Sequence, residues 1–313
     1  MTEAKTRSRL SGGTATLAGR QVARIGFGAM QLAPVPGPGG WGPPRDRDTA
    51  LAVLRRAVEL GVNHIDTAQF YGDGVANELI HAALHPYPED LVLVTKVGNG
   101  RGDSGYFPAQ RPEQLRASVE DNLRTLDVEQ VDVVNLRLRG ANPDGPPLPA
   151  DQRVDLDSQL AEMAALRDEG KIGAIGISNA SLDQVRQALP AGIACVQDFY
   201  SLLDRSGEPI LELCREHGVA WVPFFPLGSA FQGMAAKVTE HPAVVAEAAA
   251  LGVTPAQVGL AWLLAHGPHI LLIPGTSNLD HLAENVAAGD IRLGPQTMST
   301  LNDLGTTARP ATL

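Results

Sequence analysis

The sequence predicts an α/β fold, because short apolar segments typical of buried strands alternate with longer segments whose apolar residues recur at helical spacing. Eight such strand-and-helix units can be counted along the chain, and eight is the number that closes a (β/α)8 barrel, or TIM barrel. An open doubly wound sheet is the alternative, but no G-x-G-x-x-G sequence opens any of the expected helices. The barrel is therefore the predicted fold class.

The chain begins with a predicted β-hairpin. Residues 14–17 and 21–25 flank a turn at Gly19, and 21–25 is counted as the first of the eight strands. The other strands are expected at 62–66, 91–95, 131–136, 172–177, 193–196, 219–222 and 269–273. The helices are expected at 48–60, 76–84, 112–126, 157–169, 182–189, 209–217, 254–266 and 280–288. Thr254 and Gln257 can form a capping box around a first-turn proline, which predicts a well-defined helix start.

Three loops are longer than the rest, and each of them follows an expected strand. They cover residues 98–111, 140–154 and 223–240, so all three fall on the rim formed by the carboxyl ends of the strands. The segment 34–44, rich in proline and glycine, is expected to line the same rim. Loops that lengthen on one face only indicate a substrate pocket on that face.

Composition narrows the kinds of partner. The net charge of -10, without any basic run, argues against a nucleic acid or an anionic membrane as the main partner. Residues 1–13 are polar and are expected to be a flexible tail rather than a signal peptide, with one domain at 14–313 and a cytoplasmic location. Cys195 and Cys214 are too few for a disulfide framework or a metal cluster, so no metal is expected. The oligomeric state stays open.

Asp66, Tyr71 and Lys96 form the candidate catalytic group. Asp66 and Lys96 each stand where an expected strand ends, and Tyr71 lies in the loop after the first of these strands. Taken singly, Asp66 would more often cap a turn and Tyr71 would be an ordinary loop aromatic. Together, however, a lysine beside a phenol lowers the phenol's pKa, and a carboxylate holds the lysine charged. The phenol can then donate a proton near neutral pH, so this rim is the predicted active site.

Several segments, in order, resemble the aldo-keto reductases, and the resemblance covers residues 13–302. The matching segments are 26–28, 66–71, 95–96, 170–179, 196–203, 226–228 and 273–277, followed by Glu284 and Asn285. The resemblance implies the barrel that the strand count predicts independently. It also implies NADPH-dependent reduction of an aldehyde or ketone, with a small carbonyl compound as substrate.

The resemblance implies a role for individual residues. Tyr71 matches the family's general acid, and Asp66 and Lys96 match two more members of its catalytic tetrad. Ser178, Asn179 and Gln197 match the groups that hold the nicotinamide carboxamide. The other cofactor-binding residues that the resemblance implies are Gly28, Met30, Asp66, Phe224, Pro226, Leu227, Gly228, Ser229, Ile273, Gly275, Thr276, Ser277, His281, Glu284 and Asn285.

Two of the cofactor positions differ from the usual family residue. Phe224 stands where most members have a tyrosine stacked on the nicotinamide, and stacking needs only the ring face. Gly275 stands where many members have a lysine for the 2′-phosphate of NADPH. Thr276 and Ser277, with His281 nearby, can still bind this phosphate, so the resemblance still implies a preference for NADPH.

The fourth strand departs from the family pattern, because Arg137 stands where a histidine is common. Strand alternation sends Asn135 and Arg137 to one side, toward the barrel interior and its mouth. Arg137 can donate hydrogen bonds but cannot act as an acid or base. Either Arg137 faces the substrate carbonyl, or it pairs with a loop carboxylate and Asn135 orients the carbonyl. The strand resembles the bacterial branch that includes pyridoxal reductases, which suggests pyridoxal as a substrate.

Two other functions fit the same barrel. One is a nicotinamide-binding sensor or regulatory subunit, like the potassium-channel β subunits, and the other is an alcohol dehydrogenase working in the oxidising direction. The complete set of Asp66, Tyr71 and Lys96 favours chemistry over sensing. It does not distinguish the two directions of reaction.

Overall fold

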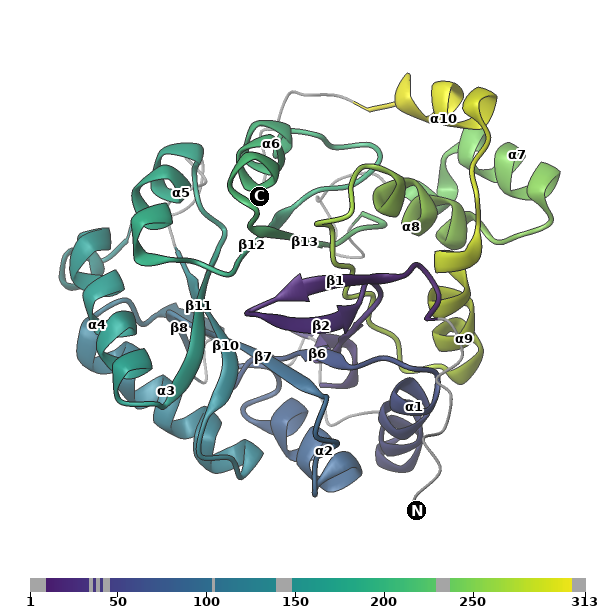
Figure 1. The fold of residues 1–313 in the computed structure, drawn as a ribbon. Helices are drawn as coiled ribbons and strands as arrows, with labels where there is room; N and C mark the ends of the chain where they lie inside the picture. Colours follow the sequence, from purple (N-terminus) through teal and green to yellow (C-terminus); the bar gives the residue numbers. More distant parts are fainter. Residues whose placement is uncertain are drawn as a thin grey trace, which may run out of the picture.

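A parallel sheet that curves into a barrel forms the centre of the molecule, with helices around it (Figure 1). The computed structural model describes residues 10–33, 36–37, 40–41, 46–102, 105–138, 148–228 and 237–305. The sheet has the order β13-β12-β11-β10-β7-β6-β3, so strands that follow one another along the chain are neighbours. Its strands are β3 (Phe27–Gly28), β6 (His64–Asp66), β7 (Val92–Val97), β10 (Val131–Arg137), β11 (Ile172–Ser178), β12 (Cys195–Phe199) and β13 (Ala220–Phe224).

Isolated bridges close the barrel between β13 and β3. Trp221 pairs with Ile270, and Leu272 pairs with Ile25, both in parallel. The barrel prediction is confirmed, with two corrections. The segment 21–25 is not the first barrel strand, because its residues up to Ala23 pair with the hairpin partner and β3 takes that place. The segment 269–273 forms bridges rather than a strand, because it pairs with one residue on each side, Trp221 of β13 and Ile25 after the hairpin.

The N-terminal hairpin, β1 (Thr14–Leu17) and β2 (Arg20–Ala23), lies across one end of the barrel (Figure 1). Leu17 and Val22 are buried against residues that fill the barrel interior. Arg20 donates a hydrogen bond of 2.6 Å to Asp132, near the start of β10. The hairpin prediction is therefore confirmed, and the hairpin covers the end where the strands begin. The opposite mouth stays open to a ligand.

Eight helices occur where the sequence predicts them, to within one residue at each end. They are α1 (Arg47–Glu59), α2 (Val75–Leu84), α3 (Pro112–Leu126), α4 (Leu156–Asp168), α5 (Leu182–Ala188), α6 (Glu208–His217), α8 (Pro255–Ala265) and α9 (Leu279–Ala287). The capping box between Thr254 and Gln257 is confirmed at the start of α8. Two helices were not predicted, α7 (Pro242–Leu251) and α10 (Pro295–Asn302). Helix α7 is apolar at nearly every position and α10 is mostly polar, so neither shows a clear apolar periodicity.

Short elements decorate the loops. Two hairpins, β4 (Pro36–Gly37) with β5 (Gly40–Trp41) and β8 (Asn99–Gly102) with β9 (Gly105–Pro108), lie after β3 and β7. The 3-10 helices are η1 (Ala29–Leu32), η2 (Ala150–Gln152), η3 (Leu189–Ala191), η4 (Val238–Glu240) and η5 (Ala288–Asp290). Of the two other long loops, residues 140–147 and 229–236 lie outside the described ranges. The division into a tail at 1–13 and one domain stays a prediction.

No single helix in the described ranges is both long enough and apolar enough to cross a membrane. Helices α7 and α8 pass such a test only when taken together, and they meet at a bend of 92°.

A buried hydrogen-bond network fixes the loop that follows β6. Asn77, in α2, accepts a bond of 2.9 Å from Thr67 and donates one of 3.0 Å to Asn122 in α3. Thr95, beside Lys96 in β7, donates a bond of 2.6 Å to the same Asn122 oxygen. All four side chains are buried, and each bond satisfies a polar group that has no access to water. The network therefore joins two helices to the strand ends that carry Asp66 and Lys96.

His64, the first residue of β6, points into the barrel interior and is buried. Gly26 makes room for it, since a Cβ on Gly26 would lie 2.2 Å from His64 Nε2. Burial lowers the pKa of His64 to about 4, against an opposing contribution from the Ala23 backbone. The imidazole is therefore neutral in the folded protein at neutral pH.

We expect His64 to make folding pH-dependent. The unfolded chain protonates this imidazole near pH 6.5, whereas the folded chain does so near pH 4, so stability present above pH 6.5 is lost as the pH falls. At about pH 4.5 the loss from this group is about 2–3 kcal/mol. The free energy of unfolding, measured with urea at that pH and at neutral pH, should depend less on pH in His64→Leu than in wild type. The exposed His217, changed to Gln, is the control, and equal pH dependence in wild type and His64→Leu would contradict the argument.

Candidate active site

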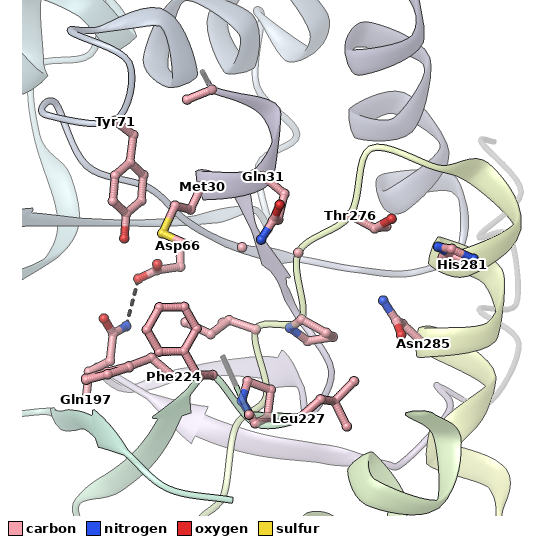
Figure 2. Close-up of a pocket in the computed structure, with 18 of the residues that line it drawn as sticks. Met30, Gln31, Asp66, Tyr71, Gln197, Phe224, Leu227, Thr276, His281 and Asn285 are labelled. Carbon is pink, nitrogen blue, oxygen red and sulfur yellow. Dashed lines mark hydrogen bonds between the residues drawn. The ribbon is translucent and has the colours of Figure 1, made fainter. Parts of the chain in front are cut away.

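A cavity of about 770 Å³ opens at the carboxyl ends of the barrel strands. Figure 2 shows Tyr71, Asp66 and Gln197 at one end of it, and His281 and Asn285 at the other. The sequence-predicted residues that line it are Gly28, Met30, Asp66, Tyr71, Lys96, Arg137, Asn179, Gln197, Phe224, Pro226, Leu227, Gly228, Ile273, Gly275, Thr276, His281, Glu284 and Asn285. The fold thus brings these residues, scattered along the chain, to one cavity.

A buried ion pair between Lys96 and Asp66 lies at the inner end of this cavity. The two residues are 2% and 3% exposed. Lys96 donates to Asp66 Oδ1 and also, over 3.1 Å, to the carbonyl of Thr67. Gln197 donates a bond of 2.8 Å to the other carboxylate oxygen, Oδ2 (Figure 2). Both oxygens of Asp66 are therefore bound, and the carboxylate cannot turn away from the lysine.

The charge on Lys96 is maintained against its burial. Desolvation disfavours the ammonium, but the charge and hydrogen bond of Asp66, together with Tyr71, outweigh it and raise the pKa of Lys96 above its ordinary value. Lys96 Nζ lies 5.0 Å from the centre of the Tyr71 ring. A fixed cation therefore stands beside the phenol.

Tyr71 is held in position by its own loop and by aromatic neighbours. Its backbone N–H donates to the Ala68 carbonyl over 2.9 Å, and its carbonyl accepts from Ala76 in α2. Its ring meets Phe70 edge-on, with centroids 5.2 Å apart, and Phe70 in turn meets Tyr106 at 5.4 Å. Because backbone and ring are both packed, the phenol has a defined direction in the cavity.

Arg137 is the residue of β10 that reaches the cavity. It donates a bond of 3.2 Å to Ser178 on β11, and its guanidinium lies 5.4 Å from the centre of the Phe224 ring. Within the described ranges no carboxylate forms an ion pair with it. Asn135, two residues earlier, is fully buried and accepts a bond of 3.4 Å from Cys195, below the large cavity. This geometry favours Arg137 over Asn135 as the group that faces a ligand.

The three residues expected to hold a carboxamide differ in their access to the cavity. Gln197 lines it, and its Oε1 has no hydrogen-bond partner among the described residues. Asn179 also lines it in the left-handed conformation, with φ of 55°, which asparagine tolerates better than most residues. Ser178 does not line the cavity, because its buried side chain lies behind Arg137 and accepts that residue's hydrogen bond.

The far end of the cavity is formed by the loop before α9 and by α9 itself. Thr276 accepts a bond of 3.1 Å from Asn278, whose own side chain accepts from the N–H groups of Asp280 and His281. These first-turn donors are thus already satisfied within the protein. Ser277 does not line the cavity. Ser229, the last residue of the expected pyrophosphate loop, lies outside the described ranges.

Two glycines let the floor of the cavity close by backbone contact. A Cβ on Gly28 would lie 2.5 Å from the Ile273 carbonyl oxygen, and one on Gly275 would lie 2.4 Å from that of Gly28. Any side chain at either position would push β3 away from the loop at 273–275. Gly28 therefore lets the backbone at Ile273 approach β3 closely, and it also lines the cavity.

Several lining residues escaped the sequence interpretation. Two of them could have been predicted to line the cavity: Phe70 because it adjoins Tyr71, and Tyr106 because it lies in a long loop on the rim. The start of α8 was predicted as a helix start but not placed at the cavity. The further lining residues are Gln31, Ala33, Phe70, Gly72, Asn99, Tyr106, Phe225, Thr239, Thr254, Pro255, Ala256 and Pro274.

The barrel and its site define a class of protein. A phenol beside a buried lysine–carboxylate pair, at the inner end of a long cavity, is suited to proton transfer to a bound small molecule. The chain belongs to the aldo/keto reductase family, whose family model matches residues 24–305. The protein is therefore an oxidoreductase, and the resemblance predicted from the sequence is confirmed.

Individual relatives agree with this assignment. The chain is 44% identical to pyridoxine 4-dehydrogenase of Escherichia coli over 297 residues, which cover 94% of this chain and 99% of that protein. It is 36% identical to an uncharacterized oxidoreductase of Schizosaccharomyces pombe, covering 94% and 90% of the two chains. Among solved structures, an aldo-keto reductase from Klebsiella pneumoniae in complex with NADPH matches with a TM-score of 0.75 and 26% identity, over 93% and 94% of the chains. The roles of single residues stay predictions.

Proposed function

We propose that the protein reduces an aldehyde or ketone to an alcohol with NADPH, and that Tyr71 supplies the proton. The observation that carries this proposal is the position of Tyr71 beside the Lys96–Asp66 pair at the inner end of the cavity. The resemblance to an NADPH complex of the same family supports the choice of cofactor. Its substrate is a small carbonyl compound, since the lining includes aromatic rings and few charges.

The residues of the cavity fit a nicotinamide dinucleotide. The unpartnered Oε1 of Gln197 can accept a bond from the carboxamide, and Phe224 offers a ring face for stacking. Leu227 and Gly228 would hold the pyrophosphate, and Thr276 with His281 would hold the adenosine end. NADPH, when bound, supplies the hydride. A volume of about 770 Å³ is within the usual range for a pocket that encloses a ligand of this kind.

The protein's own part in the reaction is to handle a proton and a charge. The phenol of Tyr71 donates its proton to the carbonyl oxygen as negative charge develops there. Lys96 stabilises the phenolate that remains, and Asp66 keeps the lysine in place and charged. Gln197 holds the carboxylate from its other side. Each group is fixed before the substrate arrives, so little reorganisation accompanies the step.

Arg137 gives the site its preference among carbonyl substrates. Its guanidinium lines the cavity with no ion-pair partner in the described part of the chain. A fixed positive charge there stabilises the oxyanion and favours a substrate with an anionic oxygen next to the carbonyl. Pyridoxal has a phenol oxygen ortho to its aldehyde, and the E. coli relative is named for pyridoxine. Pyridoxal is therefore the substrate we propose to test first.

The reverse direction is a second candidate function. The E. coli relative is named a dehydrogenase, which favours oxidation of an alcohol such as pyridoxine. The same residues would serve, because Tyr71 would then accept the proton that it donates in reduction. Initial rates with NADPH and pyridoxal, compared with NADP+ and pyridoxine at the same pH, separate the two directions.

Tyr71→Phe should lower kcat by about a hundredfold to ten-thousandfold, because general acid catalysis contributes that much. NADPH affinity, measured by fluorescence quenching, should change little, since the phenol acts on the carbonyl. Lys96→Met should behave similarly because the phenol loses its neighbouring cation. Tyr87→Phe, a tyrosine outside the cavity, is the matched control. Turnover of Tyr71→Phe near the wild-type rate would refute the assignment.

The protein should bind NADPH roughly tenfold or more tightly than NADH, because the 2′-phosphate adds charge-assisted hydrogen bonds. Direct titration of both cofactors measures the ratio. His281→Leu should reduce this ratio of affinities, since His281 lines the far end of the cavity. Equal affinities, or tighter binding of NADH, would mean that the loop at 275–277 does not read the phosphate.

Arg137→Met should lower kcat for pyridoxal by roughly a hundredfold, the effect of losing a good oxyanion donor. The decrease in kcat should be smaller for an aromatic aldehyde that lacks the ortho oxygen, and such an aldehyde is the matched substrate control. The melting temperature in saturating NADPH should stay close to that of wild type. If the variant keeps its kcat and instead loses several degrees of stability, Arg137 is a structural residue and Asn135 must orient the carbonyl.

A further inference from the structure

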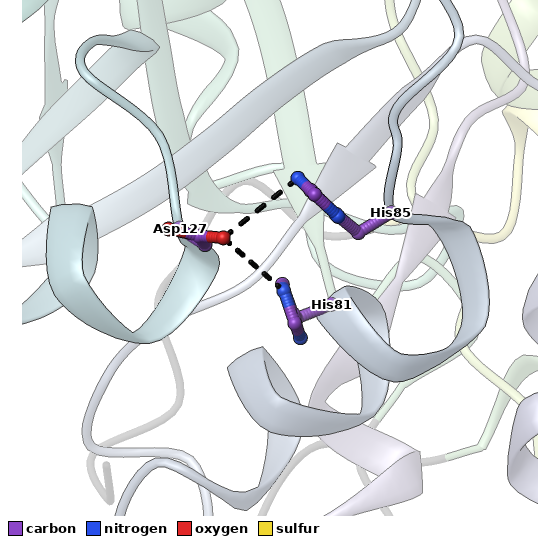
Figure 3. A group of neighbouring side chains, drawn as sticks. All are labelled: His81, His85 and Asp127. Carbon is purple, nitrogen blue, oxygen red and sulfur yellow. Dashed lines mark ion pairs between the residues drawn. The ribbon is translucent and has the colours of Figure 1, made fainter.

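Two histidines and an aspartate meet at the end of the barrel opposite the active site. His81 lies in the last turn of α2, His85 follows that helix directly, and Asp127 follows α3 (Figure 3). Both helices end where the chain turns toward the start of the next strand, β7 or β10. The cluster is therefore on the face where the strands begin, whereas Asp66 stands at the carboxyl end of β6.

The three side chains already point toward a common centre. Asp127 Oδ2 lies 3.6 Å from His81 Nε2 and 3.8 Å from His85 Nε2. The two imidazoles stack with centroids 4.8 Å apart, and Figure 3 shows both directed at the same carboxylate oxygen. The side chains are 39%, 40% and 71% exposed, in the order His81, His85 and Asp127. An ion from solvent can reach all three without any opening of the fold.

Contacts outside the cluster hold its backbone in place. A spacing of four residues puts His81 and His85 on one side of α2. Asp127 has φ of 53°, a left-handed conformation that aspartate adopts more readily than most residues, and its N–H caps α3 by donating to Leu123. Tyr87 meets His85 edge-on at 5.4 Å and donates a bond of 2.7 Å to the Leu126 carbonyl. The segment after α2 is thereby tied to the end of α3.

We propose that His81, His85 and Asp127 bind a divalent transition-metal cation of the zinc type. Two imidazole nitrogens and one carboxylate oxygen are ligands that zinc accepts, with water completing a site that has three protein ligands. Ligand bonds of normal length around a tetrahedral ion place ligand atoms about 3.3 Å apart. Asp127 lies 3.6 and 3.8 Å from the two imidazole nitrogens, and the three ligand atoms all lie within 4.8 Å of one another. Rotation of these solvent-accessible side chains can bring the ligand atoms to the spacing of a tetrahedral site.

This site has a structural consequence rather than a catalytic one. The ion would join the end of α2 to the end of α3, two helices that otherwise meet through side chains. An ion that binds the folded chain and not the unfolded one raises the stability of the fold. The expectation that the chain binds no metal considered only its two cysteines. The histidine pair at i and i+4 was a signal in the sequence, but its aspartate partner could not be placed without the fold.

Zinc titration of untagged, chelator-treated protein tests the proposal. Calorimetry should give one zinc ion per chain, and excess zinc should raise the melting temperature by several degrees. His81→Gln and Asp127→Asn should each weaken binding at least tenfold and remove most of the thermal shift. Asparagine also tolerates the left-handed backbone at position 127, so this variant preserves the turn. Equal melting temperatures of variants and wild type in chelator show that each variant is folded.

His217→Gln is the matched control, since this exposed histidine ends α6 at the same face of the barrel and belongs to no such cluster among the residues that the structure describes. It should keep both zinc affinity and thermal shift. Cobalt in place of zinc gives an independent readout, because a site with three protein ligands produces visible absorption that should be lost in His81→Gln. The proposal is overturned if zinc fails to bind, if the cluster variants bind it like wild type, or if His217→Gln loses as much affinity as they do.

Discussion

The ion pair between Lys96 and Asp66 is the interaction around which the active end of the barrel is organised. Two charges removed from water are costly unless each has partners, and removal of one typically costs about 3–5 kcal/mol because the other is left buried and unpaired. Here Thr67 and Gln197 supply the remaining hydrogen bonds. The pair thus obliges three strand ends, those of β6, β7 and β12, to keep their relative positions.

Support for the pair extends outward through polar groups that touch no ligand. Asn77 and Asn122 tie the loop after β6 and the end of β7 to α2 and α3. Their exchange for apolar residues would leave buried hydroxyls without partners, and so would loosen the loop that carries Tyr71. The geometry of the candidate site therefore depends on helix residues well behind the cavity, just as it depends on the residues that line it.

Much of the fold was predictable because burial imposes periodicity. Eight helices were located to within one residue, whereas α7, apolar at nearly every position, and α10, mostly polar, gave no clear pattern. The site was predictable where its residues stand at strand ends, as Asp66 and Lys96 do. Phe225, directly after β13, has a left-handed backbone with φ of 51° and faces the cavity, a placement that could not be read from local sequence.

The seam of the barrel has a consequence for motion. Between β13 and β3 the wall is completed by two isolated bridges and four backbone hydrogen bonds instead of a long ladder. The segment in the eighth position leads directly into Gly275 and Thr276 at the cavity. Short contacts of this kind open locally at a lower free energy than a long ladder such as that of β10 with β11, and amide exchange can detect the opening. A ligand that contacts this loop and β3 together would hold the two sides of the seam to each other. Ligand binding in the cavity and local opening of the barrel wall would then be thermodynamically coupled.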